Sequence, residues 1–114
     1  MSKTHNYPVF EHWYKTTDWI MQTSEKMPKN TRFSFSNRIL NLALDNLDLI
    51  TQAIYTKQKR HFLLKINMNL ERLRIFMRLA KDRKYISIKQ YEYIAIQINE
   101  NGKMIGGWLK NENT

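Results

Sequence analysis

Apolar residues recur at alternating spacings of three and four along most of this chain, which is the period of a helix with one buried face. The pattern predicts four helices, at about residues 8–26, 33–56, 60–83 and 88–109. The buried faces expected for the first two helices are Phe10, Trp13, Thr17 and Ile20, followed by Ile39, Ala43, Asn46 or Leu47, Ile50 and Ile54. Those expected for the last two are Leu63, Ile66, Leu70, Leu73, Met77 and Ala80, followed by Tyr91, Ile94 or Ala95, Ile98, Gly102, Ile105 and Leu109.

Local signals set several of the predicted helix ends. Pro8 suits a first turn, where its missing N–H has no partner to lose. Pro28 disfavours helical dihedrals in the residue before it, so the first helix should end earlier. Ser87 followed by Gln90 matches a capping box, which places the start of the fourth helix.

The third predicted helix carries a second apolar strip beside its main face. Its members are Leu64, Met68, Ile75 and Leu79. The main face can pack inside the protomer, but the second strip would lie in water unless another surface covers it. This pattern predicts self-association through the strip.

Composition favours a single helical domain over residues 1–114. Chains of about this length usually hold one hydrophobic core. Only three Gly and two Pro occur, whereas a sheet protein of this size needs frequent turn signals. Four helices of similar length joined by short connections predict an all-α, antiparallel up-down-up-down four-helix bundle.

Positive charge is concentrated in the third predicted helix and its flanks. Residues 57–84 contain ten Lys and Arg but only two acids, and so carry +8 of the net charge of +9. The candidate contacts for a polyanion lie along two margins and beyond the helix end: Arg60, Arg74, Arg78 and Lys81 on one margin, Lys65, Arg72 and Arg83 on the other, and Lys84 after them.

These charges have two readings, a solvated helix face and a polyanion-binding surface. A solvated face normally mixes signs, because an acid one turn from a base stabilises the helix, and here acids are scarce. Five of the ten cations are arginines, whose planar fork suits bidentate phosphate contacts. The pattern therefore favours a polyanion partner, bound through its backbone with strong salt dependence.

The polyanion is expected to be nucleic acid, with no membrane partner. A helix lying on a membrane needs a free apolar face, whereas the main face here is needed for the core. No uninterrupted apolar stretch approaches the ~20 residues that span a bilayer. Trp19, Tyr55, Tyr85 and Tyr93 are candidates for stacking on unpaired bases, although a tyrosine on a helix is more often half-buried in packing.

The sequence predicts no enzyme activity, no cofactor and no metal site. It contains no cysteine, and its three histidines are dispersed without a second ligand one turn away. It has neither the Glu-x-x-His pairs of a di-iron bundle nor a Gly-rich phosphate loop. Absence of cysteine and of a secretory signal suggests a reducing, cytoplasmic location. Two further classes remain open: a scaffold bundle that docks an acidic protein, and a small enzyme with a site in its core.

Glycine is unexpected inside the fourth predicted helix. Gly102 and Gly106 lie one turn apart, and each costs about 1 kcal/mol relative to alanine. Close approach of a neighbouring helix or of another chain would offset that cost, with Trp108 folding over the gap.

Three segments resemble the accessory variability determinant family of diversity-generating retroelements. They are Leu73–Ala80 (LRIFMRLA), Ser87–Glu92 (SIKQYE) and Gly102–Leu109 (GKMIGGWL), and weaker N-terminal matches rest on Trp13, Met27-Pro28 and Arg38. The family belongs to a wider four-helix-bundle group that includes proteins encoded in intervening sequences of ribosomal RNA. That second type is an alternative identity for this chain.

The resemblance implies a non-enzymatic accessory protein. Members form a ring-like homopentamer with a basic surface, bind RNA and DNA, and associate with the element's reverse transcriptase. With a structured RNA they support adenine-directed, error-prone cDNA synthesis that feeds mutagenic retrohoming. On this chain the resemblance makes Arg74 and Arg78 the paired basic positions and Lys103 a further basic position. It also makes Gly106-Gly107-Trp108 a helix-packing signature, which Gly102 precedes.

Overall fold

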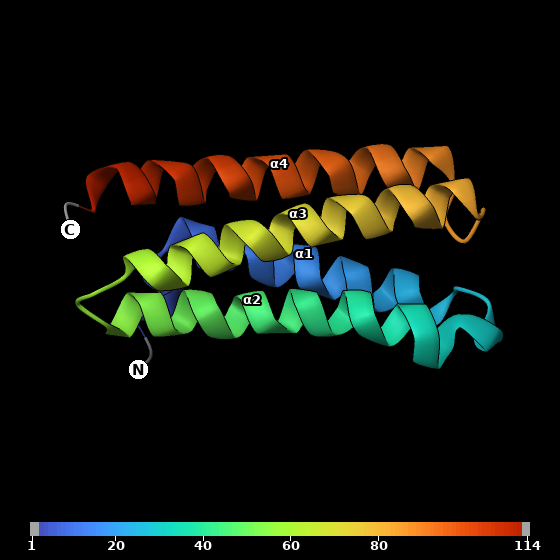
Figure 1. Cartoon of the computed structure of the whole chain (residues 1–114), viewed down its shortest axis with the longest axis horizontal. Helices are drawn as coiled ribbons and strands as arrows, with labels where there is room; N and C mark the ends of the chain where they lie inside the picture. The colour runs from blue at the N-terminus through green and yellow to red at the C-terminus, as the bar shows by residue number, and fades with distance from the viewer. Residues whose placement is uncertain (1–2, 113–114) are drawn as a thin grey trace.

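Four antiparallel α-helices form the protein, and the computed structural model describes residues 3–112. They are α1 Pro8–Glu25, α2 Asn37–Tyr55, α3 Arg60–Asp82 and α4 Ile88–Asn111. Figure 1 shows the helices side by side, with the start of α1 and the end of α4 at the same end of the bundle. Each helix packs on the next in sequence, and α1 also contacts α4. The predicted all-α four-helix bundle is confirmed.

The buried faces follow the predicted periodicity closely. All six residues predicted for the main face of α3 are buried. Of the alternatives left open, Asn46 and Ile94 are buried, whereas Leu47 and Ala95 lie at the margins. Trp13 is fully buried and its Nε1 donates a hydrogen bond to the carbonyl of Ala43 at 2.9 Å, which ties α1 to α2.

The start of the second helix differs from the prediction. Residues Arg32–Ser36 form a π-helical turn ahead of α2, so the regular α-helix begins at Asn37 and not near residue 33. The side chains of Thr31 and Ser36 are buried, with their hydroxyl oxygens 3.3 Å apart. The wide turn also brings Phe35 against Phe76 and Tyr85. The π-helical turn thus coincides with the packing of this polar pair and of the aromatic cluster. The spacing of apolar residues does not predict such a turn.

The connection between α3 and α4 is set by two local motifs. Lys84 has a φ of 64°, and the N–H groups of Lys84 and Tyr85 donate to the carbonyls of Lys81 and Ala80, which is a Schellman arrangement without glycine. The predicted capping box is confirmed, because Ser87 and Gln90 exchange side-chain to backbone hydrogen bonds at 3.0 and 2.7 Å. Helix α4 extends two residues beyond the predicted end, to Asn111.

Buried asparagines connect the helices in two places. At the α2–α3 interface, Asn46 donates to the carbonyl of Ile66 and accepts from Asn69. At the α1–α4 interface, Asn101 Nδ2 lies 3.1 Å from His12 Nδ1, and Oδ1 of Asn101 has no hydrogen-bond partner within residues 3–112. None of the helices in this range combines the length and apolar character that a membrane span requires.

Candidate nucleic-acid interface

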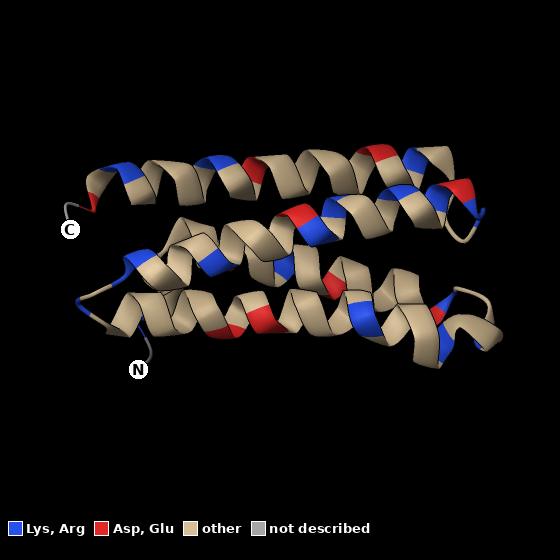
Figure 2. Cartoon of the chain, in the orientation of Figure 1, with Lys and Arg blue, Asp and Glu red and all other residues tan. Residues whose placement is uncertain are grey.

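The cations of α3 lie along two grooves, one on each side of the helix. Arg74 lines the groove between α3 and α4 together with Lys103 of α4. Lys65 and Arg72 line the groove between α2 and α3. Figure 2 shows Lys and Arg recurring along α3, while acidic residues occupy the middle of α2. The two grooves therefore differ in charge, because α2 contributes Asp45 and Asp48 to one groove and α4 contributes Lys103 to the other.

In the α3–α4 groove, the guanidinium of Arg74 is held in place from both helices. Its Nε donates to Asn99 Oδ1 of α4 at 3.0 Å, and its Nη1 donates to Glu71 Oε1 at 3.0 Å. Gly102 lies beneath the group, because a Cβ added there would be 3.2 Å from Nη2 of Arg74. The predicted close approach at Gly102 thus involves an arginine side chain, with Leu70 as the next neighbour.

In the α2–α3 groove, two carboxylates stand beside two cations. Asp45 and Asp48 of α2 line this groove together with Lys65 and Arg72. Nη1 of Arg72 also donates to Asn69 Oδ1 at 3.1 Å, and Asn69 is bonded to the buried Asn46. Arg72 is therefore the outer end of a hydrogen-bonded chain that begins in the core.

Most remaining cations of the basic segment are open to solvent. Arg78, Arg83 and Lys84 are exposed, and the ring of Tyr85 lies 5.9 Å from the guanidinium carbon of Arg83. Lys81 is half-buried, forms an ion pair with Asp82 at 3.4 Å and lies over Tyr91. Within residues 3–112 the ion pairs are Arg74 with Glu71 and Lys81 with Asp82. Most of the predicted cations thus form no ion pair within this range, although Asp45 and Asp48 line the same groove as Lys65 and Arg72.

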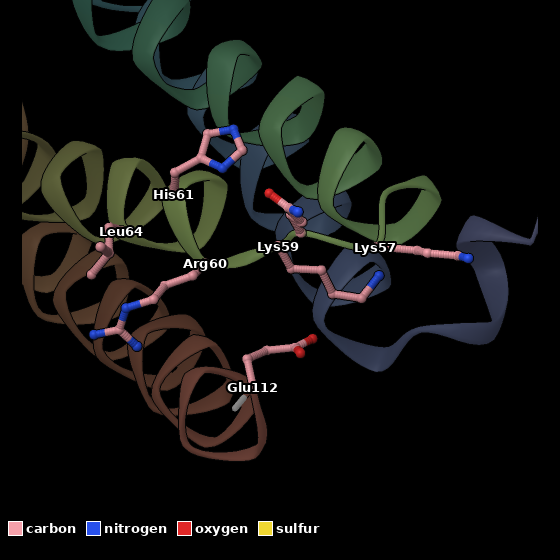
Figure 3. A pocket seen from close by; sticks show the side chains of 7 residues that line it. Lys57, Lys59, Arg60, His61, Leu64 and Glu112 are labelled. Carbon is pink, nitrogen blue, oxygen red and sulfur yellow. The ribbon is translucent and has the colours of Figure 1, made fainter. Parts of the chain in front are cut away.

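A pocket of about 600 Å³ opens at the end of the bundle where α3 begins, and Arg60 is one of its lining residues. Figure 3 shows that Lys57 and Arg60 extend in opposite directions and that Glu112 of the α4 end lies among the cations. Lys59 Nζ donates to the carbonyls of Ala53 and Thr56, both at 2.6 Å, and so caps the C-terminal end of α2. These cations diverge and do not converge on one ligand position.

The second apolar strip of α3 lies on the surface of the protomer. Leu64, Met68, Ile75 and Leu79 are between 46% and 55% exposed. They point away from the core formed by the main face, as the helical spacing predicts. The stacking candidates on other elements are engaged within the protomer, since Trp19 contacts Tyr93 and Tyr85 contacts Phe35.

The remaining glycines have no close neighbour inside the protomer. A Cβ added to Gly106 or Gly107 would meet nothing within 4 Å. A neighbouring helix of the same protomer therefore does not explain these two positions, and close approach of another chain stays a prediction. Trp108 is half-buried, with its ring 5.6 Å from that of Tyr7. Among residues 3–112 there is no group of three His, Cys, Asp or Glu side chains that could hold a metal ion.

Four contributing residues were not anticipated from the sequence. Asn99 orients Arg74, Lys59 caps α2, and Asp45 and Asp48 face the cations of α3. The two aspartates are spaced three apart on α2, which shows that they share a face. Which neighbouring helix that face meets depends on how the helices pack.

Comparison with protein families finds a match to the family described as bAvd-like, whose model covers residues 9–112. No curated protein matches the chain. The match spans all four helices.

Proposed function

This chain belongs to the bAvd-like family, and from that membership and its basic helix we propose that it is a non-enzymatic accessory subunit of a diversity-generating retroelement. In this role it binds RNA and DNA and associates with the reverse transcriptase, and it supports mutagenic cDNA synthesis and retrohoming in the cytoplasm. The observation that carries the proposal is the excess of positive charge in residues 57–84, which carry +8 and of whose cations only Arg74 and Lys81 form ion pairs within residues 3–112.

The backbone at Lys84 adds support for a functional positive surface. This residue occupies the left-handed region, which costs a residue with a side chain roughly 1–2 kcal/mol and which glycine adopts freely. A lysine at such a position extends the row of cations beyond the end of α3.

Assembly into a ring-like homo-oligomer is the second part of the proposal. The exposed strip of α3 supplies one apolar surface, and Tyr14, Met21 and Leu44 are exposed on α1 and α2. A ring requires two different surfaces on each copy, because its contacts are head-to-tail. The proposed number of five copies in the ring rests on the family resemblance. Repetition of one basic face around a ring would raise avidity for a single nucleic acid.

Replacement of Arg74 and Arg78 by alanine tests nucleic-acid binding. The double variant should keep the helical fold, because both side chains are outside the core, but it should bind RNA and DNA more weakly. The slope of log K against log salt should fall by about 1.4 to 1.8, at ~0.7 to 0.9 per lost phosphate contact. Fluorescence anisotropy across a salt series measures this, and cDNA synthesis with the partner polymerase should fall in parallel. Binding that does not change with ionic strength would reject the proposal.

Nuclease treatment separates this function from protein docking alone. If the basic helix binds an acidic protein and no nucleic acid, capture of the reverse transcriptase will be the same before and after nuclease. If RNA contributes to the complex, nuclease will reduce the captured polymerase.

A further inference from the structure

We propose that nucleic acid follows the α3–α4 groove and leaves the α2–α3 groove unoccupied. One edge of the basic helix then binds a phosphodiester backbone, while the opposite edge belongs to the structure of the bundle. This inference rests on the proposed nucleic-acid binding and assigns its site. The edge facing α4 carries Arg60, Arg74 and Arg78, with Lys103 across the groove.

Arg74 is prepared for a phosphate before any ligand arrives. Asn99 and Glu71 each take one N–H of the guanidinium, and Gly102 leaves room for the group to lie against α4. Nη2 donates no hydrogen bond within residues 3–112, so this nitrogen keeps its charged donors for a ligand. A guanidinium held in this way loses little freedom on binding a phosphate oxygen.

The other cations of this edge continue the same line. Arg74 and Arg78 are one turn apart, and Arg60 lies on the same side of the helix near its start. At a rise of 1.5 Å per residue, Arg60 and Arg78 are about 27 Å apart along α3. Lys103 lines the middle of the groove beside Arg74. The arrangement is a row that can follow a strand of several nucleotides.

The α2 edge of the same helix is electrically balanced. Asp45 and Asp48 offset Lys65 and Arg72, and their two carboxylates would repel an incoming phosphate, whereas the α3–α4 groove has one carboxylate, Glu71, beside Arg74 and Lys103. Arg72 is also committed to Asn69, which continues to the buried Asn46. The cations of this edge therefore share their groove with an equal number of carboxylates and are poorly placed for a polyanion.

A matched pair of double variants tests the assignment. Arg74→Gln with Lys103→Gln alters the α4 edge, and Lys65→Gln with Arg72→Gln alters the α2 edge. Each pair removes one arginine and one lysine, so each lowers the net charge from +9 to +7. Long-range attraction is therefore the same in both proteins. The probe is a fluorescein-labelled single-stranded RNA of mixed sequence, titrated from about 50 to 200 mM salt, with circular dichroism as the check on folding.

The α4-edge pair should weaken RNA binding about tenfold or more and lower the salt slope by about 1.5. The α2-edge pair should change affinity by less than about twofold and leave the slope as in the unaltered protein. Equal loss in both pairs, or loss confined to the α2-edge pair, would overturn the groove assignment while leaving nucleic-acid binding intact. If the unaltered protein binds no RNA, the proposed function fails as well.

Gly102→Ala tests Arg74 as a positioned group without removing any charge. The added methyl should displace the guanidinium, because it would lie 3.2 Å from Nη2, while alanine favours the helix and should raise the thermal midpoint. RNA affinity and the salt slope should both fall, the slope by about 1. Gly106→Ala is the control for helix propensity, since its methyl meets nothing within 4 Å in the protomer, and light scattering checks that both variants keep the oligomer of the unaltered protein. A Gly102→Ala protein that binds RNA with unchanged slope would show that the placement of Arg74 is unimportant.

Discussion

The two apolar faces of α3 contain the same kinds of side chain in opposite surroundings. Leu70 and Leu73 are buried in the bundle, whereas Met68 and Ile75 are more than half exposed. Burial of the first set drives folding of the protomer, because apolar area leaves water when the helices pack. The second set contributes little to that step and remains available for contact between copies. One helix thus serves folding with one face and, in our proposal, assembly with the other.

The largest effect is expected when charge is placed on the exposed strip. Met68→Glu with Ile75→Glu should abolish self-association, because two carboxylates would have to lose their hydration in an apolar interface. Light scattering should then report the 13.8 kDa protomer in place of about 69 kDa for five copies. Circular dichroism should still show a folded helical protein. A variant whose mass equals that of the unaltered protein would place the interface elsewhere.

The next effect compares one residue from each face. Leu70→Ala should reduce the free energy of unfolding by about 2–5 kcal/mol through lost burial and a residual cavity. Leu79→Ala, at a position of the exposed strip that the assembly-deficient background leaves unaltered, should change the stability of the isolated protomer by no more than about 0.5 kcal/mol. Both values come from urea denaturation on the assembly-deficient background, where association does not add to stability. Similar losses for the two variants would mean that the exposed strip also supports the fold.

The smallest effect is expected at Lys84, just after the C-terminal end of α3 and its two apolar faces. Lys84→Gly should raise the free energy of unfolding by about 1 kcal/mol, since glycine adopts the left-handed conformation without steric cost. RNA affinity should fall slightly at the same time, because one cation of the surface is lost. Lys110→Gly, within α4, is a control in which the same substitution should destabilise the helix. An equal destabilisation at both sites would argue against strain at Lys84.

Much of the fold could be predicted because helical periodicity records which side chains avoid water. The six-residue main face of α3 and the exposed strip beside it were both expected from spacing alone, and the Ser87–Gln90 cap was expected from two residues. The burial of Asn46 could not be predicted in this way. Spacing allowed either Asn46 or Leu47 to face inward, and hydrophobicity would favour leucine. The asparagine is buried because Ile66 and Asn69 provide its hydrogen-bond partners.

The candidate site was predictable in part. The sequence identified the basic segment and its two margins, since charge and helical period are both properties of a single element. It did not separate the margins by role. Asn99 orients Arg74 across twenty-five residues of sequence, and the carboxylates of Asp45 and Asp48 reach the opposite margin from another helix. The half-buried Gly106 and the exposed Gly107 have no neighbour in the protomer that explains them.

By itself, the sequence determined that this protein is a helical bundle whose third helix carries an excess of positive charge and a second apolar strip. Those properties are local, because they depend only on which residues recur every three or four positions. The tertiary structure alone decided that one edge of α3 meets the acids of α2 and that the other meets Asn99, Gly102 and Lys103 of α4. The physical reason is that the surroundings of a charge depend on side chains brought alongside by packing, which the period of one helix does not encode.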